Sequence, residues 1–409
     1  MLLYRLLLSL FAAYTLARTA ARDGAVAARK RLSPGPAPVG RFVWLHGASN
    51  GELASARPIL ERLVAARPDL HWLVTANTQT GVALVASWEL PRVAARLAPL
   101  DLHYPTTRLM RDWRVCAHIT LESELWPNRF LTCPGPVLLL GARMTEGTAR
   151  TWGRFPQLAR RVLSRVSFAS AQDSGSAGRL AALGLPSAAR GPVTDLKAFF
   201  TAPPPPADPM LDAAFARART WLAASTHEGD DTIALTAHAL CLKQSPDLRL
   251  ILAPRHARRA DAIAAEAAQM GLTLARRSLG EVPGTAQVYM ADTMGEMPLW
   301  YARAGRVFIG GTLSDRGGHT PYEPAAFGAA LLHGPDTRNF AAAYARLAAA
   351  QASIEIRTAE DLAQALSSLE AGDAQEAAGE QAAAALRQDT SLDTLALALL
   401  DHLPAPEHA

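Results

Sequence analysis

The sequence contains few cysteines, and none of them forms a recognisable pair. Only Cys116, Cys133 and Cys241 occur among 409 residues, without a Cys-x-x-Cys spacing and without histidines at the spacing of zinc ligands. This odd, scattered set excludes a disulfide framework and a structural zinc site. It favours a reducing compartment such as the cytosol.

Charged residues are also scarce. They make up 19% of the chain, against 49% hydrophobic residues, a balance that excludes general disorder. The net charge of +4 and the isoelectric point near 9.1 suit anionic membranes or phosphorylated substrates. No Lys/Arg run is interleaved with aromatic residues, so we expect no nucleic-acid partner. The mean hydropathy of +0.05 is high for a purely soluble enzyme and indicates contact with lipid.

The amino terminus is apolar but shorter than a full membrane span. Residues 1–17 read MLLYRLLLSLFAAYTLA, with Arg5 inside the run, and a basic flank follows up to Arg31. A helix perpendicular to the membrane needs ~20 apolar residues. We expect an uncleaved membrane anchor over residues 1–31, with the basic flank on the cytoplasmic face. A helix packed on the protein's own surface is the alternative.

The length and the hydrophobic pattern predict two α/β domains. Short runs rich in Val, Ile and Leu alternate with longer Ala/Leu/Arg stretches, which is typical of βα units in a parallel sheet. The proline tract FTAPPPPADP at residues 200–209 cannot donate hydrogen bonds to a sheet, so we interpret it as a linker. We expect one Rossmann-like domain over residues 32–199 and a second over residues 210–409, ending in helices packed on the sheets.

The strands of these domains place the motifs. We predict strands at residues 42–45, 71–75, 115–121, 137–140 and 166–169 of the first domain and at 221–224, 248–252, 288–290, 307–309 and 330–333 of the second. Ligands of open α/β sheets bind at the carboxyl ends of the strands. Functional residues are therefore expected directly after strands.

The first such motif is FVWLHGASNGELASARPIL at residues 42–60. A turn of small residues leads into an amphipathic helix whose Leu53, Ile59, Leu60 and Leu63 face inward, with Glu52 in its first turn. On position alone, Glu52 could serve only to complement the helix dipole. A role of Glu52 in catalysis is the other interpretation.

The second motif, HITLESELWPNRF at residues 118–130, ends a strand with two carboxylates. Burial and mutual repulsion are expected to raise the pKa values of Glu122 and Glu124. One of the two carboxyls could transfer a proton or balance charge. In the alternative, one Glu is solvated and the other caps the following helix.

The third motif, ASTHEGDD at residues 224–231, groups a histidine with acids. Its spacing is not His-Glu-x-x-His, and no second histidine lies on the same helical face, so we expect no metal. A helix capped by Ser225 or Thr226, with acids in its first turn, accounts for the pattern.

A fourth group lies in the second half. It comprises LAPRHARR with Arg255 and His256, ADTMGEMPLWYA, and the glycine-rich GGTLSDRGGHTPYEPAAFG. Glycine turns after successive strands allow close approach of a ligand and predict a nucleotide pocket. Glu323 is suited to hold two ribose hydroxyls. Turn glycines with a purely structural role are the alternative.

Together these segments resemble the transferases of 3-deoxy-D-manno-octulosonic acid (Kdo). The resemblance runs in order along nearly the whole chain: SNGE at residues 49–52, ESELWPN at 122–128, DLK at 195–197, STHEGDD at 225–231, PRH at 254–256, DTMGE at 292–296, GGHTPYEPAAFG at 317–328 and GPDTRNF at 334–340.

The resemblance implies a GT-B fold, in which two Rossmann-like domains face a cleft, with an N-terminal membrane anchor. It implies inverting transfer of Kdo from CMP-Kdo to the lipid A precursor lipid IVA in lipopolysaccharide biosynthesis, at the cytoplasmic face of the bacterial inner membrane, with no cofactor and no metal. Glu52 matches the general base, and Glu122 and Lys197 match residues that stabilise the transition state. The CMP-binding segments correspond to Arg255, His256, Met294, Gly295, Glu296, Thr320, Pro321, Tyr322 and Glu323.

The sequence also departs from the family pattern. Asn50, Gly141, Asp195, Arg258 and Thr320 replace the usual residues, and the basic segment at residues 28–41 is shorter than in the family. A paralogue that transfers Kdo or a related CMP-activated ulosonic acid to another membrane acceptor is therefore an alternative. A non-catalytic sugar-nucleotide-binding protein is a third possibility, which the retained Glu52, Glu122 and Lys197 disfavour.

Overall fold

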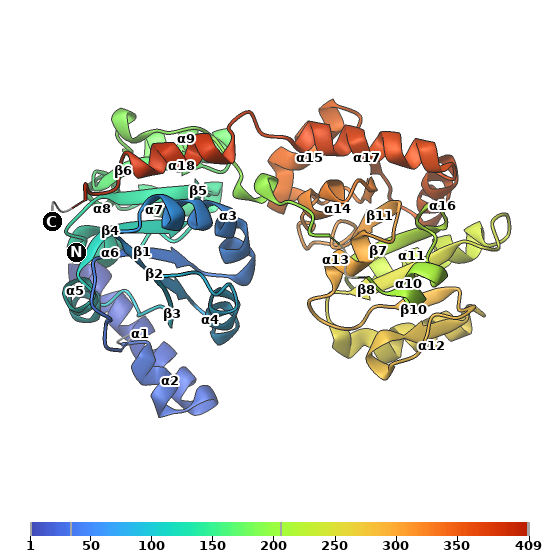
Figure 1. The fold of residues 1–409 in the computed structure, drawn as a ribbon, viewed down its shortest axis with the longest axis horizontal. Coiled ribbons are helices and arrows are strands. Elements are labelled where there is room, and N and C mark those ends of the chain that lie inside the picture. Colours follow the sequence, from blue (N-terminus) through green and yellow to red (C-terminus); the bar gives the residue numbers. More distant parts are fainter. Residues whose placement is uncertain (1, 33–34, 205–206, 407–409) are drawn as a thin grey trace. The chain divides into compact units, whose positions relative to one another are not determined.

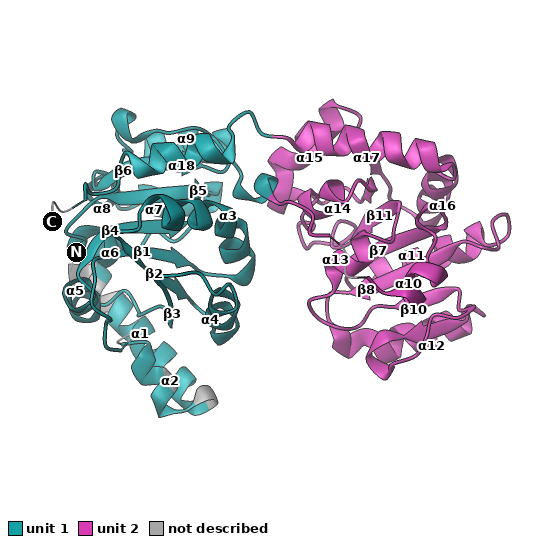
Figure 2. Ribbon diagram, in the orientation of Figure 1, with its two compact units in different colours: residues 1–199, 388–409 teal, residues 200–387 magenta. Residues whose placement is uncertain are grey.

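The computed structural model describes residues 2–32, 35–204 and 207–406. The chain divides into two compact units, shown in Figures 1 and 2. Unit 1 comprises residues 1–199 and 388–409, and unit 2 comprises residues 200–387. Each unit is built around a parallel sheet of its own and is described by itself.

The sheet of unit 1 has the strand order of a Rossmann domain. Its six strands run β3-β2-β1-β4-β5-β6, all paired in parallel, the order of the doubly wound dinucleotide-binding fold. β1 and β5 are buried at every position because helices cover both faces of the sheet. The strands are β1 (Phe42–Gly47), β2 (His71–Ala76), β3 (Val93–Leu97), β4 (Val115–Leu121), β5 (Val137–Ala142) and β6 (Val166–Ala171).

The helices of unit 1 pack their apolar faces on this sheet. Ser49 is the N-cap of α3 and accepts a hydrogen bond from the backbone N–H of Glu52. The four residues that were predicted to face inward are buried: Leu53, Ile59, Leu60 and Leu63. The helices are α1 (Leu2–Asp23), α2 (Ala25–Lys30), α3 (Asn50–Ala66), α4 (Gln79–Ala86), α5 (His103–Asp112), α6 (Pro127–Thr132), α7 (Glu146–Gly153), α8 (Pro156–Leu163), α9 (Ser174–Ala182) and α18 (Leu392–Leu400), with short 3₁₀ turns at Ser187–Ala189 and Leu196–Phe199.

The last helix belongs to unit 1. Leu395, Leu399 and Leu403 are buried in the core that β1 and α3 share, and residues 388–409 cluster with unit 1. The prediction that the chain from residue 210 to its end forms one domain was wrong in this part. The apolar pattern of α18 shows that the helix covers a sheet, but it does not specify which of the two sheets.

The sheet of unit 2 has seven parallel strands in the order β13-β12-β11-β7-β8-β10-β9. Trp221 and Phe308, from neighbouring strands, are fully buried in its core. The strands are β7 (Thr220–Thr226), β8 (Arg249–Pro254), β9 (Leu274–Arg276), β10 (Val288–Met290), β11 (Arg306–Ile309), β12 (Ala330–His333) and β13 (Ile354–Glu355). The helices are α10 (Pro209–Ala214), α11 (Asp230–Cys241), α12 (Ala260–Gln269), α13 (Met297–Tyr301), α14 (Tyr322–Ala326), α15 (Ala341–Ala349), α16 (Ala359–Ser368) and α17 (Gly372–Leu386).

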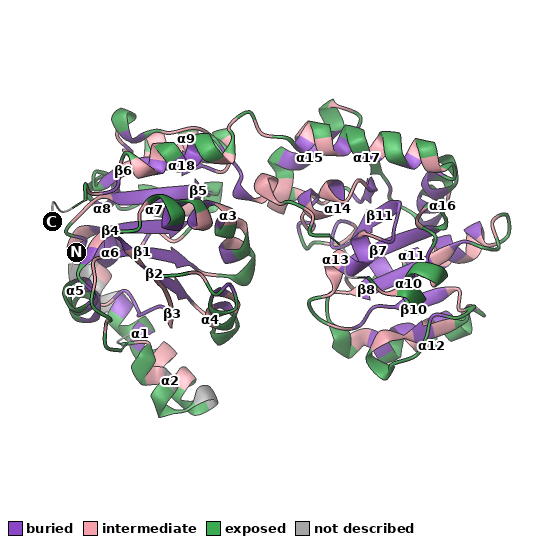
Figure 3. Ribbon diagram, viewed as in Figure 1, coloured by how far each residue is buried: buried purple, intermediate pink, exposed green. Residues whose placement is uncertain are grey.

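The amino-terminal helix α1 packs with one side on the rest of unit 1. Leu8 and Ala12 are buried, and the Tyr4 hydroxyl donates a 2.7 Å hydrogen bond to Asp101 Oδ2, while much of the remaining surface of α1 and α2 is exposed (Figure 3). Within the described part of the chain, no helix combines the length and the apolarity needed to cross a membrane. The burial of Leu8 and Ala12 corresponds to the alternative of a helix packed on the protein's own surface.

Candidate active site

Glu52 lies in the first turn of α3, directly after the buried strand β1. Its carboxylate accepts hydrogen bonds from the backbone N–H of Ala48 and from the hydroxyl of Ser49, both at 2.9 Å. Glu52 therefore does satisfy groups at the start of the helix, as the simpler interpretation requires. Burial raises the pKa of its carboxyl to about 7, and the charges on Glu122 and Glu124 add to this, against the opposing effect of the two hydrogen bonds. A carboxyl that titrates near neutral pH is suited to accept a proton.

Glu122 and Lys197 form an ion pair beside this position. Glu122 follows β4 with a left-handed backbone (φ 45°), an uncommon conformation for a residue with a side chain. Hydrogen bonds from Glu122 N–H to Leu140 O and from Arg143 N–H to Glu122 O, both 3.2 Å, hold this turn. Lys197 Nζ donates to Glu122 Oε1 at 2.6 Å, and the Lys197 backbone N–H donates to Asp195 at 3.0 Å. The structure thus brings Glu52, Glu122 and Lys197 together in unit 1.

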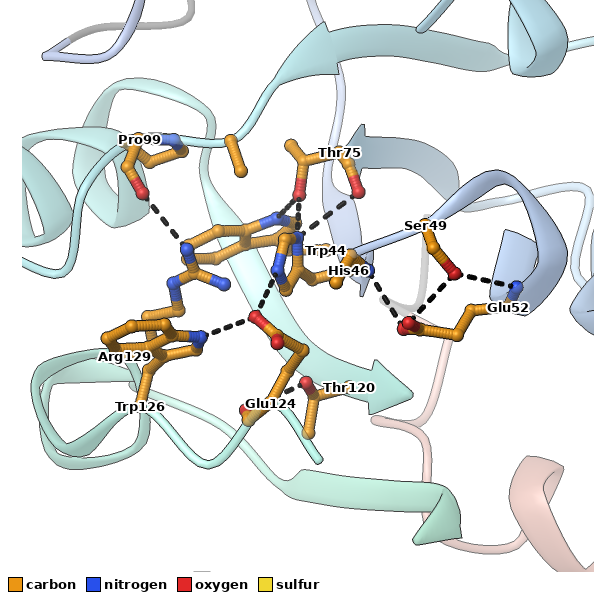
Figure 4. Close-up of polar contacts among 12 residues, drawn as sticks. Trp44, His46, Ser49, Glu52, Thr75, Pro99, Thr120, Glu124, Trp126 and Arg129 are labelled. Carbon is orange, nitrogen blue, oxygen red and sulfur yellow. Dashed lines mark hydrogen bonds and ion pairs between the residues drawn. The ribbon is translucent and has the colours of Figure 1, made fainter. Parts of the chain in front are cut away.

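Glu124 is held differently from Glu122. Its Oε2 accepts hydrogen bonds from the Trp126 indole at 2.6 Å and from His46 Nε2 at 3.1 Å (Figure 4). Burial alone would raise the pKa of Glu124, but the hydrogen bonds from His46 and Trp126, with the charge on Arg129, lower it to about 2. The expectation that both carboxyls of this motif have raised pKa values was therefore wrong for Glu124.

The helix that follows this motif is capped by neither Glu. Asp101, which is 2% exposed, accepts the backbone N–H groups of Asn128 and Arg129 at 2.9 and 2.8 Å. The same carboxylate accepts the hydroxyl of Tyr4. Asp101 therefore connects the amino-terminal helix α1 to the start of α6, which carries Arg129. The alternative in which a motif Glu caps this helix was also wrong.

In unit 2, hydrogen bonds tie together the carboxyl ends of β7, β8 and β11. Asp230 Oδ2 accepts the backbone N–H of His227 at 2.8 Å and that of Gly311 at 2.6 Å, while the Arg255 N–H donates to Thr226 O at 2.9 Å. The N-cap of α11 is Gly229, without a side-chain cap, so the predicted cap by Ser225 or Thr226 was wrong. Asp230 serves instead as a clamp between two strand ends.

The glycine-rich segment is shaped by contacts with the protein itself. A side chain at Gly310 would meet Ser225 O at 2.7 Å, and one at Gly318 would meet Asp336 O at 2.9 Å. These two glycines are therefore required by close packing of the backbone, as in the structural alternative. His319 from this segment stacks on His227 with 5.2 Å between ring centroids, and their Nε2 atoms are 2.9 Å apart.

The residues predicted to bind CMP follow β8, β10 and β11: most lie in the loops after these strands, and Tyr322 and Glu323 begin α14. Arg255 and His256 are exposed, Met294 is 76% exposed, and Gly295 has a positive φ of 87°. Glu296 is engaged by Arg277 Nη2 at 2.9 Å. Thr320 Oγ1 accepts the N–H of Tyr322 at 3.3 Å, next to buried Pro321.

Glu323 differs from Glu296, the other predicted CMP-binding acid, in that no described residue forms an ion pair with it. Burial alone raises the pKa of its carboxyl, with no hydrogen bond opposing it. The residue is half-buried, so its carboxylate can accept hydrogen bonds from a ligand. That Glu323 binds hydroxyl groups stays a prediction.

The buried polar residues that interact with Glu124 were not predicted from the sequence. His46, Thr75 and Arg129 are 0–2% exposed and lie on β1, β2 and α6. A histidine that interrupts the apolar run FVWLHG was the available signal, because a buried polar side chain needs a partner.

Comparisons with known proteins show the family of the chain. The family described as 3-deoxy-D-manno-octulosonic-acid transferase (kdotransferase) matches residues 18–199. The 3-deoxy-D-manno-octulosonic acid transferase of Haemophilus influenzae is 31% identical over 338 residues, 80% of this chain and 78% of the relative. That of Bordetella pertussis is 33% identical over 350 residues, 80% of each chain.

Solved structures resemble the fold of the chain at low identity. A UDP-GlcNAc 2-epimerase from Neisseria meningitidis has a TM-score of 0.61 at 12% identity and covers 88% of this chain and 100% of that one. A glycosyltransferase from Rickettsia africae has a TM-score of 0.60 at 11% identity, covering 89% and 98%. The fold class is therefore that of GT-B-like α/β enzymes with two parallel-sheet units. Within this class, the identity to named relatives shows that the chain belongs to the Kdo transferase family and is a glycosyltransferase.

Proposed function

We propose that the chain transfers Kdo from CMP-Kdo to the lipid A precursor lipid IVA, with inversion at the anomeric carbon. The observation that carries this proposal is Glu52, an acid with a pKa of about 7 beside the Glu122–Lys197 ion pair. A general base is most effective when its pKa is near the working pH. A binding protein without catalysis would not need to keep a carboxyl in this state.

In the proposed reaction, Glu52 removes the proton of an acceptor hydroxyl. The acceptor oxygen forms a bond to the anomeric carbon of Kdo while the bond from that carbon to the CMP phosphate oxygen breaks. Attack opposite to the leaving group inverts the configuration. Lys197 and Glu122 match the residues that balance charge in the transition state, and the short ion pair keeps the ammonium group in place.

The residues of unit 2 are proposed to hold the donor. Glu323 is suited to bind the ribose hydroxyls, and Arg255 and His256 to meet the phosphate. The segments Met294–Gly295–Glu296 and Thr320–Pro321–Tyr322 complete the proposed CMP site. CMP leaves as a monophosphate whose charge cationic side chains can meet, so the proposal includes no metal and no cofactor.

The proposed place of action is the cytoplasmic face of the bacterial inner membrane. Leu10, Phe11 and Tyr14 on α1 are 65%, 51% and 64% exposed, and the flank with Arg29 and Lys30 is exposed as well. An exposed apolar stripe with basic residues beside it suits an anionic lipid surface. Such contact would bring unit 1 to an acceptor that lies in the membrane.

The test is transfer from freshly made CMP-Kdo to lipid IVA by the purified full chain in detergent, with EDTA present. We expect a lipid product heavier by one or more Kdo units, as measured by mass spectrometry. CMP binding without transfer to lipid IVA would overturn the acceptor assignment and favour another membrane acceptor. Transfer that stops when EDTA is added would overturn metal independence.

A further inference from the structure

A buried chain of hydrogen bonds ends at Glu124, and its direction can be assigned from the partners (Figure 4). The Trp44 indole can only donate, and it donates to Thr75 Oγ1 at 2.8 Å. The Thr75 hydroxyl is then free to donate to His46 Nδ1, 2.9 Å away. His46 Nδ1 also lies 3.1 Å from the Thr75 backbone oxygen, but an ionised Glu124 can only accept, so His46 Nε2 carries the proton and donates to Glu124 Oε2 at 3.1 Å.

The surroundings keep His46 neutral and Glu124 ionised. Burial and then the charge on Arg129 lower the pKa of His46 to about 4. Arg129 itself is 2% exposed and lies over the rings of Trp44 and Trp126, at 5.1 and 5.6 Å from their centroids. A buried guanidinium requires a negative charge nearby, which Glu124 helps to supply.

The hydrogen bonds to the Glu124 side chain all go to one of its two carboxylate oxygens. Both the His46 and the Trp126 hydrogen bonds go to Oε2, and Oε1 has no hydrogen-bond partner among the described residues. The Glu124 side chain remains 17% exposed, and its charge acts on Glu52. Glu124 thus presents a fixed, ionised oxygen that can accept one more hydrogen bond close to the proposed base.

We propose that Glu124 Oε1 binds a hydroxyl group of the acceptor, close to the hydroxyl that attacks the donor, and that Trp44, Thr75 and His46 are positioning residues for it. The proposal rests on the proposed function of Glu52. A carboxylate accepts hydrogen bonds from neutral hydroxyl groups, and Glu124 lies close enough to Glu52, the proposed base for the acceptor hydroxyl, for its charge to act on it. The ligand of Oε1 is therefore a hydroxyl of the acceptor, and Glu124 contributes to acceptor specificity.

The direct test combines Glu124→Ala with acceptors that each lack one hydroxyl of the sugar. For wild type, we expect one deoxy acceptor to lose about 10- to 100-fold in kcat/KM, the range for a hydrogen bond to a charged group. In Glu124→Ala, kcat/KM for the same deoxy acceptor should lie close to kcat/KM for the complete acceptor, because the carboxylate that binds the missing hydroxyl has been removed. Equal losses for every analogue in both enzymes would overturn the proposal. Glu61→Ala, on the exposed side of α3, is the matched control and should change none of these values.

The positioning role is tested at Thr75, with one variant that lacks the hydroxyl and one that retains it. Thr75→Val removes the hydroxyl that donates to His46 Nδ1, so the form with its proton on Nδ1, which donates to the Thr75 backbone oxygen 3.1 Å away, gains population. Donation from Nε2 to Glu124 is weakened accordingly. We expect ¹⁵N-histidine NMR to report the switched tautomer and the KM for the acceptor to rise about tenfold, with the KM for CMP-Kdo unchanged. Thr75→Ser retains the hydroxyl and should restore both readouts. An unchanged tautomer in Thr75→Val would overturn this role.

The two proposals fail in different ways. If wild type transfers no Kdo to any acceptor, the proposed function fails. If wild type is active and Glu124→Ala shows no analogue-dependent coupling, only the role of Glu124 fails. Should Thr75→Val not fold, as judged by circular dichroism, the Glu124→Ala measurement still decides the role of Oε1.

Discussion

Replacing Glu52 by glutamine should make the protein more stable at alkaline pH while it stops transfer. The pKa of Glu52 is raised from an ordinary 4.5 to about 7 in the folded protein, chiefly by burial. The folded state therefore binds this proton more tightly than the unfolded state. Raising the pH from about 4.5 to about 7 costs stability, and the loss is complete above pH 7.

The magnitude follows from the shift. A difference of about 2.5 pKa units corresponds to about 3 kcal/mol. Glutamine has the same shape without the ionisation, so Glu52→Gln recovers most of this loss at pH 8 and almost none at pH 5. For a unit of roughly 200 residues, this raises Tm at pH 8 by about 6–12 °C.

The assay is differential scanning calorimetry of wild type and Glu52→Gln at pH 5 and pH 8, with transfer measured on the same samples. We expect the Tm values to differ at pH 8 and nearly coincide at pH 5, and transfer by the variant to be lost. A Tm difference that is the same at both pH values would refute the raised pKa, and with it the physical case for Glu52 as the base.

The other predictions concern the rate, the donor and the membrane. The kcat/KM of wild type should fall about tenfold per pH unit below about pH 7, because protonated Glu52 cannot accept a proton; a flat profile down to pH 5 would contradict this. Lys197→Met should lower kcat about 10²- to 10³-fold, with CMP affinity by calorimetry unchanged. Glu323→Ala should weaken CMP binding about tenfold, whereas Glu52→Ala should leave CMP affinity unaltered. Phe11→Ser should reduce sedimentation with anionic vesicles, and Val39→Ser, at a 93% exposed position outside the helices, is the control; equal vesicle binding by both variants would contradict a role for α1.

Inner strands were predictable from the sequence, whereas three of the four edge strands, β3, β9 and β13, were not. β4, β10 and β12 were predicted with their observed bounds, because each is short, mostly apolar and without an acid, Lys or Arg. β3 was missed because VAARL lacks such a run and its residues are mostly only partly buried. β9 (LAR) and β13 (IE) are short and each ends in a charged residue, so no apolar run indicates them.

The candidate site was predictable where its residues follow a strand directly. Glu52 and Glu122 stand after apolar runs, and that position alone indicates the carboxyl edge of the sheet. The partners of Glu124 could not be predicted, since Thr75 and His46 meet only through the pairing of β1 with β2. The lowered pKa of Glu124 was missed for the same reason: spacing along the chain indicates repulsion between two acids, whereas their neighbours in space decide the outcome.

The most direct test of the central claim is a single-turnover reaction of wild type and Glu52→Gln with CMP-Kdo and lipid IVA. The anomeric configuration of the product is read by NMR. We predict a Kdo-lipid product of inverted configuration from wild type and no product from Glu52→Gln, although both bind CMP equally. Retention of configuration, or transfer by Glu52→Gln at a rate near that of wild type, would contradict the account.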